Sequence, residues 1–382
     1  GIIMEEVRTE KRRGLPGWLK ILLAVVVTLA VTVGGTCLLL GKSGLALMEG
    51  WLLAKYAFVD TEADLDGAAD KALDALVEGL GDRWSYYLTE ERYQRVKESR
   101  ANNYVGVGVT VSYEDERGLL VVGVTEGGPA EGAGVLPGDV ITAVDGVSVA
   151  GDERYNATNK VAGEEGTDVT LTLLGEDGET REVTCRRKRL RSPSASGRML
   201  EDNVGYVKLA NFYTGSADSF RSVTDGLLAD GAEGLVIDLR NDPGGYISEL
   251  EDILDYLLPE GVVLTQKPRW WFRMETKSDA ACVSVPMVVL VNSETYSAAE
   301  LLAAQLRETY GTPIVGELTS GKGYSQVTFP LPNGGGLGIS VATYCTGSGH
   351  SLIGEGITPD VELSLASDSD SQLQAALDLL KQ

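Results

Sequence analysis

Apolar and polar residues recur with different periods along the chain, and the changes of period divide it into segments. Residues 21–40, "ILLAVVVTLAVTVGGTCLLL", form an uncharged run of about the length that crosses ~30 Å of hydrocarbon as a helix. A helix at the edge of a soluble core shows a polar face, and this run has none. We therefore expect one transmembrane helix at 21–40, preceded by a cytoplasmic segment at 1–20.

The residues around this run predict its orientation. Five basic residues precede it: Arg8, Lys11, Arg12, Arg13 and Lys20. By the positive-inside rule, everything after Lys42 then lies on the extracytoplasmic side of the cell membrane, in the periplasm or at the cell exterior. A cleaved signal peptide is the alternative, but the run is long for that role and no A-x-A site follows. Cys37 would suit a lipoprotein, yet "GGTC" lacks the usual aliphatic residue three positions before the cysteine.

Residues 44–101 are expected to form a helical segment. In "AADKALDALVEGL" the apolar residues recur at helical spacing. A turn follows in "GDRWSYYL", after which Thr89 is a typical N-cap and Glu91 lies in the first turn of a second helix.

The period changes to that of short strands from residue 102 onward. "YVGVGVTVSY" and "GLLVVGVT" are typical of strands. "GGPAEGAGVLPGDVITAVDGVSVAG" predicts a short helix, a Pro-Gly turn, a strand and an Asp-Gly hairpin turn, and a second hairpin is expected around residues 176–178. Residues 102–190 should therefore form a small β-rich domain, and "RSPSASG" at 191–197 reads as a linker.

Residues 191–382 alternate between strand and helix patterns. "VGYVKLANF", "GLVIDLR", "MVVLVN" and "TPIVGE" predict strands, whereas "SADSFRSVTDGLLADG", "ISELEDILDYLL" and "SAAELLAAQLRET" predict helices. This order favours an α/β layer with crossover connections. "SQLQAALDLLK" predicts a last amphipathic helix.

Composition excludes several classes of partner. The chain carries 33 Lys/Arg and 56 Asp/Glu, a net charge of −23, which should repel nucleic acid and anionic membrane surfaces. With one His and no C-x-x-C, a Cys/His zinc site is not expected, and we expect no metal or cofactor. One disulfide among Cys185, Cys282 and Cys345 would be compatible with the sequence but cannot be assigned.

The stretch "GELTSGKGYSQ" (316–326) nearly matches the phosphate-binding loop G-x-x-x-x-G-K-[ST], but Gly323 replaces the Ser or Thr. Such a loop must open a helix, and the β-rich sequence after Lys322, with Pro330 and Pro332, cannot supply one. A nucleotide site is therefore not expected. Taken alone, Lys322 is most simply a surface lysine in a glycine turn, and Ser297 a helix N-cap.

Together these residues suit acyl transfer. Ser297 would lie at an exposed elbow between a strand and a helix, beside backbone amides and the positive end of the helix dipole. The single His350 has no obvious carboxylate partner, so Lys322 is the economical base. Its pKa must fall by about 3, which costs roughly 4 kcal/mol, and burial can lower it. The amides of Ala298 and of Gly244 or Gly245 could hold the oxyanion.

At this point the chain resembles the carboxy-terminal processing, or tail-specific, proteases. The similar segments run in family order: "DRWSYYL", "YVGVGV" with "GGPAEGAGVLPGDVITAVDGVSV", "LRNDPGG", "NSETYSAAELLAAQL", "VGELTSGKGYSQ", "GHSLIGEGITPDVEL" and "DSQLQAALDLLK". The resemblance implies that Ser297 is the nucleophile, Lys322 the general base and Gln326 the residue that orients Lys322. Spacing alone does not single out Gln326, and contact with it requires a bend after Gly323.

The resemblance also implies an architecture. Residues 191–382 would be the protease core, an α/β fold of the ClpP/crotonase-like superhelix type. Residues 102–190 would be an embedded PDZ domain whose backbone amides bind a C-terminal carboxylate, at Tyr104, Val105, Gly106, Val107 and Gly108. In the family this domain can also gate the active site.

Some residues depart from the family pattern. Tyr296 replaces a small residue before the serine, which predicts a narrower or capped cleft. Ala299, Asp242 and Leu318 replace commoner Ser, Asn and Lys, and His350 stands where Arg is usual, which favours a structural role for His350. None of these changes removes a predicted catalytic group.

The sequence thus predicts a membrane-anchored serine endopeptidase that recognises polypeptides by free, apolar C-termini. The alternative is a catalytically silent PDZ adaptor that binds C-termini in the cell envelope. A homodimer through residues 44–101, as in some relatives, would be compatible with either reading.

Overall fold

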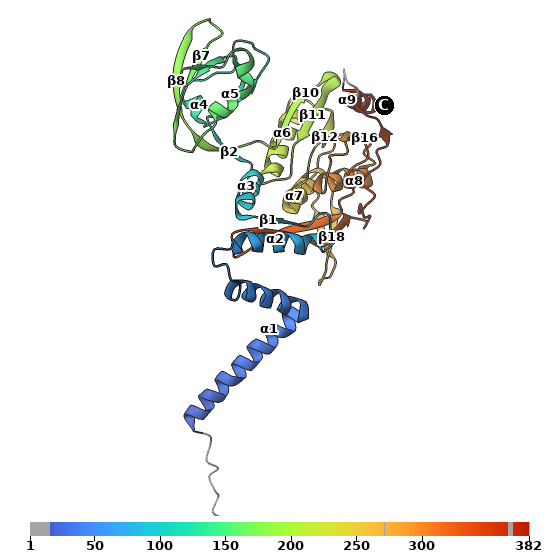
Figure 1. The fold of residues 1–382 in the computed structure, drawn as a ribbon. Helices are drawn as coiled ribbons and strands as arrows, with labels where there is room; N and C mark the ends of the chain where they lie inside the picture. Colours follow the sequence, from blue (N-terminus) through green and yellow to red (C-terminus); the bar gives the residue numbers. More distant parts are fainter. Residues whose placement is uncertain (1–15, 271, 366–369, 382) are drawn as a thin grey trace, which may run out of the picture. The chain divides into compact units, whose positions relative to one another are not determined.

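The computed structural model describes residues 16–270, 272–365 and 370–381 (Figure 1). The chain divides into two compact units, Gly1–Leu76 and Val77–Gln382, and each is described by itself. The basic residues Arg8, Lys11, Arg12 and Arg13 lie outside the described residues. The orientation that they predict therefore stays a prediction.

The first unit contains one long apolar helix, α1 (Gly17–Tyr56), none of whose residues is buried. Gly41 interrupts it with φ 60° and ψ −173°, a conformation that glycine adopts without steric cost. The predicted span at 21–40 lies entirely on the N-terminal side of this break. By length and composition α1 is a candidate membrane span, a description that suits a membrane anchor and a signal sequence alike. Helix α2 (Leu65–Glu78) follows.

The second unit contains the small β-rich domain. Its sheet has the order β3-β4-β5-β7-β8 with β6 paired to β5: β3 (Val109–Ser112), β4 (Leu119–Val124), β5 (Val140–Val144), β6 (Val147–Ser148), β7 (Asp168–Leu174) and β8 (Thr180–Arg186). β2 (Asn103–Gly106) pairs with β9 (Lys188–Arg191), and the helices are α4 (Pro129–Gly132) and α5 (Arg154–Val161). Leu119, Ile141 and Leu171 are fully buried in its core. Asp145 and Gly146 both have positive φ in the predicted hairpin turn, as a two-residue turn of this kind requires.

The rest of this unit is built on a six-stranded sheet of order β10-β11-β12-β15-β16-β19. Its strands are β10 (Ala195–Met199), β11 (Val204–Leu209), β12 (Gly234–Asp238), β15 (Met287–Val291), β16 (Ile314–Gly316) and β19 (Val361–Glu362). β11 to β19 pair in parallel, and β10 pairs with β11 antiparallel. Parallel strands need crossover connections. Helices provide these between β11 and β16, whereas residues 317–360 connect β16 to β19 without a helix.

Side chains alternate between the two faces of this sheet, as strand geometry requires. Leu235 and Ile237 share one core with α6 (Ser216–Ala229), α7 (Ile247–Leu257) and α8 (Ala298–Tyr310). Val236 and Leu290 belong to a second core with α9 (Ser371–Leu380). The sheet is therefore covered on both sides, and the near-continuous apolar runs "GLVID" and "MVVLV" reflect that burial.

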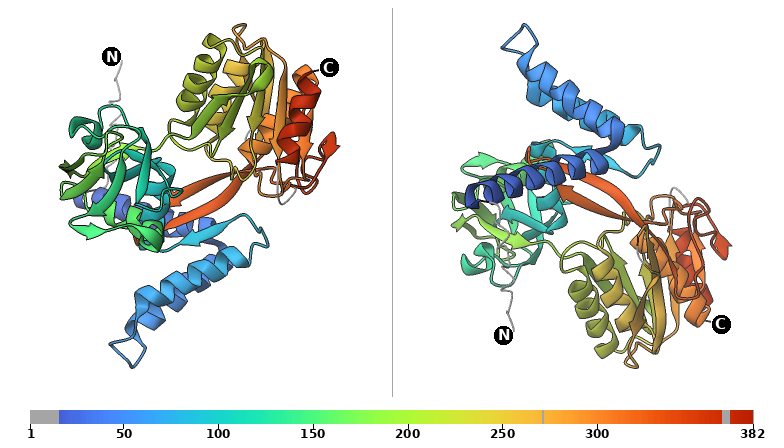
Figure 2. Two further views of the ribbon diagram at one scale, coloured as in Figure 1. Left: turned by 90° about the horizontal axis from the view of Figure 1, so that it is seen from above. Right: turned by 90° about the horizontal axis from the view of Figure 1, so that it is seen from below.

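A second sheet brings distant segments together. It has the order β1-β18-β13-β14, with β17 also paired to β18: β1 (Tyr86–Leu88), β13 (Gly261–Pro268), β14 (Met274–Ser278), β17 (Tyr324–Pro330) and β18 (Gly336–Thr346). Figure 2 shows the long β17–β18 ribbon in orange, and β1 pairs antiparallel with β18. Residues 82–88 therefore lie beside the strands that follow Lys322. Helix α3 (Glu90–Arg100) comes next, with Thr89 at its N-cap.

The helix and strand predictions for residues 204–229, 234–257 and 287–316 are confirmed. The expected linker at 191–197 is partly wrong, because β10 begins at Ala195 and pairs with β11. Strands β13 and β14 and helix α5 were not expected. All four cysteines are free. A ClpP/crotonase-like superhelix stays a prediction.

Candidate active site

Ser297 lies at a sharp turn between β15 and α8. Its φ of 55° and ψ of −117° are rare for a residue with a side chain, and such strain is typical of functional sites. Two contacts hold the turn: the Ser297 amide donates to Glu300 Oε2 at 2.8 Å, and the Tyr296 amide donates to the Asp242 carbonyl at 2.9 Å. The hydroxyl is therefore held at the start of a helix by the surrounding backbone, with 7% of the residue exposed.

Glu300 joins this turn to the loop that carries Lys322. Its carboxylate is fully buried and accepts five hydrogen bonds, from the amides of Ser297, Gly321 and Lys322 and from the hydroxyls of Thr319 and Ser320, at 2.6–3.1 Å. We assigned no role to Glu300 from the sequence. The spacing Ser297-x-x-Glu300 is that of a capping box, which could have pointed to it.

The Lys322 amine is fixed by Gln326 and Trp84. Lys322 Nζ donates to Gln326 Oε1 at 2.7 Å and lies 5.1 Å from the centre of the Trp84 ring. Gln326 Nε2 in turn donates to the Trp84 carbonyl. The register of β17 shifts between Ser325 and Gln326, so this strand does not run as an ideal extended chain over that stretch. The structure thus brings Lys322 and Gln326 into contact.

The turn that contains Trp84 is itself fastened to the second sheet. Asp82 accepts hydrogen bonds from the hydroxyls of Ser85 and Ser340, each at 2.6 Å. Ser340 lies on β18, so the "DRWSYYL" segment positions the Trp84 carbonyl against β17. The ring of Tyr296 packs edge-to-face on Trp84, with ring centres 6.2 Å apart. Tyr296 is not among the residues that line the pocket.

Burial lowers the pKa of Lys322 to about 8, because the charged ammonium loses its hydration. The positive charge of Arg100 lowers it further, whereas Asp82 and Glu300 act in the opposite direction. A substantial fraction of Lys322 is therefore neutral near pH 8, which a general base requires.

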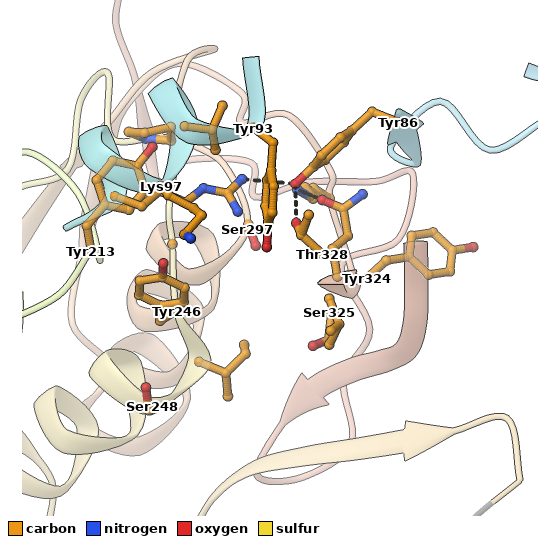
Figure 3. Close-up of a pocket in the computed structure, with 18 residues that line it drawn as sticks. Tyr86, Tyr93, Lys97, Tyr213, Tyr246, Ser248, Ser297, Tyr324, Ser325 and Thr328 are labelled. Atoms are coloured by element: carbon orange, nitrogen blue, oxygen red, sulfur yellow. Dashed lines mark hydrogen bonds between the residues drawn. The ribbon is translucent and has the colours of Figure 1, made fainter. Parts of the chain in front are cut away.

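Ser297 and Lys322 line the same pocket of about 440 Å³ (Figure 3). Within the described residues no hydrogen bond joins their side chains. The Ser297 hydroxyl is instead hydrogen-bonded to the Tyr344 hydroxyl at 2.9 Å. Tyr344 is fully buried on β18 and was not singled out from the sequence.

The loop at Gly244 and Gly245 touches the serine turn. A Cβ at Gly244 would lie 3.0 Å from both the Ala298 nitrogen and Ser297 Cβ, so only glycine fits there. The Gly244 amide donates to Asp242 Oδ1 at 2.8 Å. The hydrogen bonds of the described chain include no such partner for the Gly245 or Ala298 amides, which favours these two as oxyanion donors.

Asp242 is an unusual member of this loop. It is fully buried, and its Oδ2 has no hydrogen-bond partner among the described residues. Burial raises the pKa of this carboxyl well above its usual value, although the Gly244 amide and Lys208 oppose the change. Burial thus favours the protonated form of Asp242, which resembles an asparagine in charge and shape.

The five residues predicted to bind peptide line a separate pocket of about 310 Å³ in the small domain. Tyr104 to Gly108 form one side, together with Val109, Val111 and Leu119. Thr158, Asn159, Val161 and Ala162 line it from the end of α5. The cavity is mostly apolar and lies between a strand and a helix, which suits an extended chain with an apolar side chain.

Comparison with known proteins identifies both parts of the second unit. Residues 104–185 match the PDZ domain model, and residues 203–363 match peptidase family S41. The carboxyl-terminal-processing protease of Synechocystis sp. is 32% identical over 87% of this chain and 81% of its own length. That of Picosynechococcus sp. is 31% identical over 87% of this chain and 84% of its own. A Bacteroides fragilis structure described as an S41 protease shares the fold, with a TM-score of 0.51, 16% identity and coverage of 81% of this chain and 90% of that one. The chain therefore belongs to the carboxyl-terminal-processing proteases of peptidase family S41, which are serine-type peptidases, and it carries a PDZ domain.

Proposed function

We propose that this protein is a membrane-anchored serine endopeptidase that cuts polypeptides after its PDZ domain has bound their free, apolar C-termini. The observation that carries the proposal is the half-buried amine of Lys322, which is held by Gln326 in the same pocket as Ser297. A lysine with a lowered pKa and a serine at a strained turn are the two groups that a Ser-Lys hydrolase needs.

In the proposed reaction, neutral Lys322 removes the proton of Ser297 and the serine oxygen attacks the peptide carbonyl. The amides of Ala298 and Gly245 stabilise the oxyanion. Lys322 then protonates the leaving amine, and water hydrolyses the acyl-enzyme. Because the hydroxyl of Ser297 is bonded to Tyr344 in this conformation, the flexible stem of Lys322 must swing from Gln326 toward Ser297 before the proton moves.

Substrate selection is assigned to the PDZ domain. The tail would lie as an extra strand beside Tyr104–Gly108, with its carboxylate at the backbone amides and its last apolar side chain against Val109 and Leu119. We further propose that α1 anchors the protein with residues 77–382 on the extracytoplasmic side.

The test is cleavage of a quenched fluorescent peptide with an apolar free C-terminus by the full chain in detergent micelles. Wild type should cut it, and Ser297→Ala and Lys322→Ala should lose at least about 10³-fold in kcat/KM, as removal of a nucleophile or its base does. Lys277→Ala, at an exposed position on β14, is the matched lysine control and should keep full activity. Near-wild-type activity of Lys322→Ala would rule out the Ser-Lys site. Binding without cleavage by wild type would support the adaptor reading.

A further inference from the structure

The charge of the catalytic pocket is opposite to that of the protein. The chain has 56 acidic and 33 basic residues, yet none of the 18 residues that line this pocket is Asp or Glu. Three are cations: Lys97, Arg100 and Lys322. Since Lys322 is assigned to proton transfer, Lys97 and Arg100 are left without a role. A basic pocket in a strongly acidic protein attracts anions.

Arg100 is the more informative of the two. It is the last residue of α3, and its side chain is half-buried. Its Nη2 donates to the Tyr86 hydroxyl at 3.1 Å, and its guanidinium also donates to the Tyr213 hydroxyl, so part of its five N–H donors is used by neutral tyrosine oxygens. Among the described carboxylates none forms an ion pair with it.

Two other half-buried arginines of the described residues have carboxylate or multiple backbone partners. Arg240, with 11% of its side chain exposed, binds the carboxylates of Asp238 and Asp370. Arg187 donates to several backbone carbonyls. Withdrawing a cation from water without an anionic partner is unfavourable. Arg100 contacts tyrosine hydroxyls but pairs with no carboxylate of the described residues, which favours an anionic partner that arrives with the ligand.

The surroundings of Arg100 suit a carboxylate. Lys97 precedes it by three residues on α3, so both side chains leave the same face of the helix. Tyr213 and Tyr246 add hydroxyl donors, and Figure 3 shows them on the same side of the pocket as Lys97. A guanidinium matches a carboxylate with two parallel hydrogen bonds.

We propose that Arg100 and Lys97 form a subsite for a carboxylate of the peptide substrate inside the catalytic pocket. This deepens the proposed function, on which it rests. The carboxylate is either the terminal one, of a tail short enough to end in the pocket, or the side chain of an Asp or Glu close to the scissile bond. The enzyme would then select on charge next to the cut as well as on the apolar tail bound by the PDZ domain.

The experiment compares matched quenched peptides on the full chain in detergent micelles. One pair differs only in a free or an amidated C-terminus. A second set replaces Asn or Gln by Asp or Glu at each position flanking the cut. Each peptide is measured with wild type, Arg100→Gln, Arg100→Lys, Lys97→Gln and Arg95→Gln. Arg95 is the control, because it lies on the same helix but is exposed, pairs with Glu91 and does not line the pocket.

We expect wild type and Arg95→Gln to prefer one carboxylate peptide over its neutral partner by about tenfold or more in kcat/KM, as charge-assisted hydrogen bonds allow. Arg100→Gln should lose most of this preference and Lys97→Gln part of it, while Arg100→Lys should keep some. The PDZ domain contributes equally to the carboxylate preference of every variant. Dividing the preference of wild type by that of Arg100→Gln therefore gives the contribution of Arg100 alone. The pair whose preference falls in Arg100→Gln identifies the carboxylate as terminal or side-chain.

The same peptides are titrated into Ser297→Ala, with and without Arg100→Gln, and binding is followed by fluorescence anisotropy. This arm works even if no peptide is cut, so failure of the proposed protease and failure of the subsite can be told apart. Thermal melting checks that each variant is folded. The subsite is overturned if wild type shows no carboxylate preference, or if Arg100→Gln leaves the preference unchanged in folded protein.

Discussion

The Tyr344 hydroxyl lies 2.9 Å from Ser297 Oγ and 2.5 Å from the backbone carbonyl of Lys322. A tyrosine has one hydroxyl proton, and a carbonyl can only accept. If the Tyr344 proton satisfies the carbonyl, the Ser297 hydroxyl must donate to Tyr344. The Ser297 proton, which the proposed reaction must move, is then directed at Tyr344 and away from Lys322, the proposed base.

Tyr344→Phe tests this arrangement. Without the tyrosine hydroxyl, the Ser297 proton is free to turn to Lys322, so a fluorophosphonate probe should label the serine several-fold faster than in wild type. The Lys322 carbonyl loses its partner, so the free energy of unfolding should fall by about 1–2 kcal/mol. Labelling kinetics and chemical denaturation measure the two effects. Slower labelling would mean that Tyr344 assists the serine.

The lowered pKa of Lys322 predicts the pH dependence of activity. A base must be neutral to accept a proton, and the pKa of Lys322 is about 8. Below that value kcat/KM should fall about tenfold for each pH unit, and above it kcat/KM should level off. Initial rates from pH 6 to pH 10 with an uncharged peptide give the profile. A flat profile across pH 7–9 would contradict a titrating lysine.

Gln326 should act by positioning the amine. Gln326→Ala removes the acceptor of the Lys322 ammonium, and we expect kcat to fall about 10- to 100-fold with little change in KM, because an orienting contact affects mainly the transition state. Gln326→Glu keeps the acceptor but adds a negative charge, so the pKa seen in kcat/KM should rise. If the pH profile of kcat/KM is unchanged in Gln326→Glu, Gln326 does not influence the titrating amine.

Gly244→Ala should damage the site through a clash. Its Cβ would lie 2.8 Å from the Tyr296 carbonyl and 3.0 Å from the Ala298 nitrogen, so the serine turn must move. We expect kcat/KM to fall by about 10²-fold or more, because misplaced catalytic groups lose that much. Gly178→Ala is the matched control: Gly178 has a similar positive φ, of 81°, and open space around it. It should cost about 1 kcal/mol of stability and no activity.

Asp242→Asn should stabilise the protein increasingly as pH rises. Because burial raises the pKa of Asp242 in the folded state, the folded protein keeps a proton that the unfolded chain releases above pH ~4. The stability contributed by this proton is complete below that pH and is lost as pH rises toward the folded pKa. Asparagine has no such proton. The gain in Tm should therefore be larger at pH 8 than at pH 4, and equal gains would show that Asp242 does not titrate in this way.

The sequence predicted most of the parallel sheet and its helices, because short apolar runs such as "GLVID" indicate buried strands and "ISELEDILDYLL" has the apolar spacing of a helix. It also pointed to Ser297 and Lys322, because one begins a helix after a strand and the other follows a glycine turn. Gln326 came only from the family resemblance. Tyr344 could not be found, since its contact with Ser297 depends on how β18 pairs, many residues away. The lack of a carboxylate partner for Arg100 among the described residues is likewise a property of the folded pocket.

The buried carboxylate of Glu300 has a consequence for control. It holds the backbone of Ser297 and the backbone of Lys322 at once, so the two segments form one rigid body with the start of α8. Moving the Lys322 loop away from the serine turn would cost a large free energy, because the buried carboxylate of Glu300 would lose its hydrogen-bond donors. A switch would therefore act on groups that Glu300 does not hold: the Lys322 amine, the Trp84 carbonyl that binds Gln326, or the entry of substrate to the pocket.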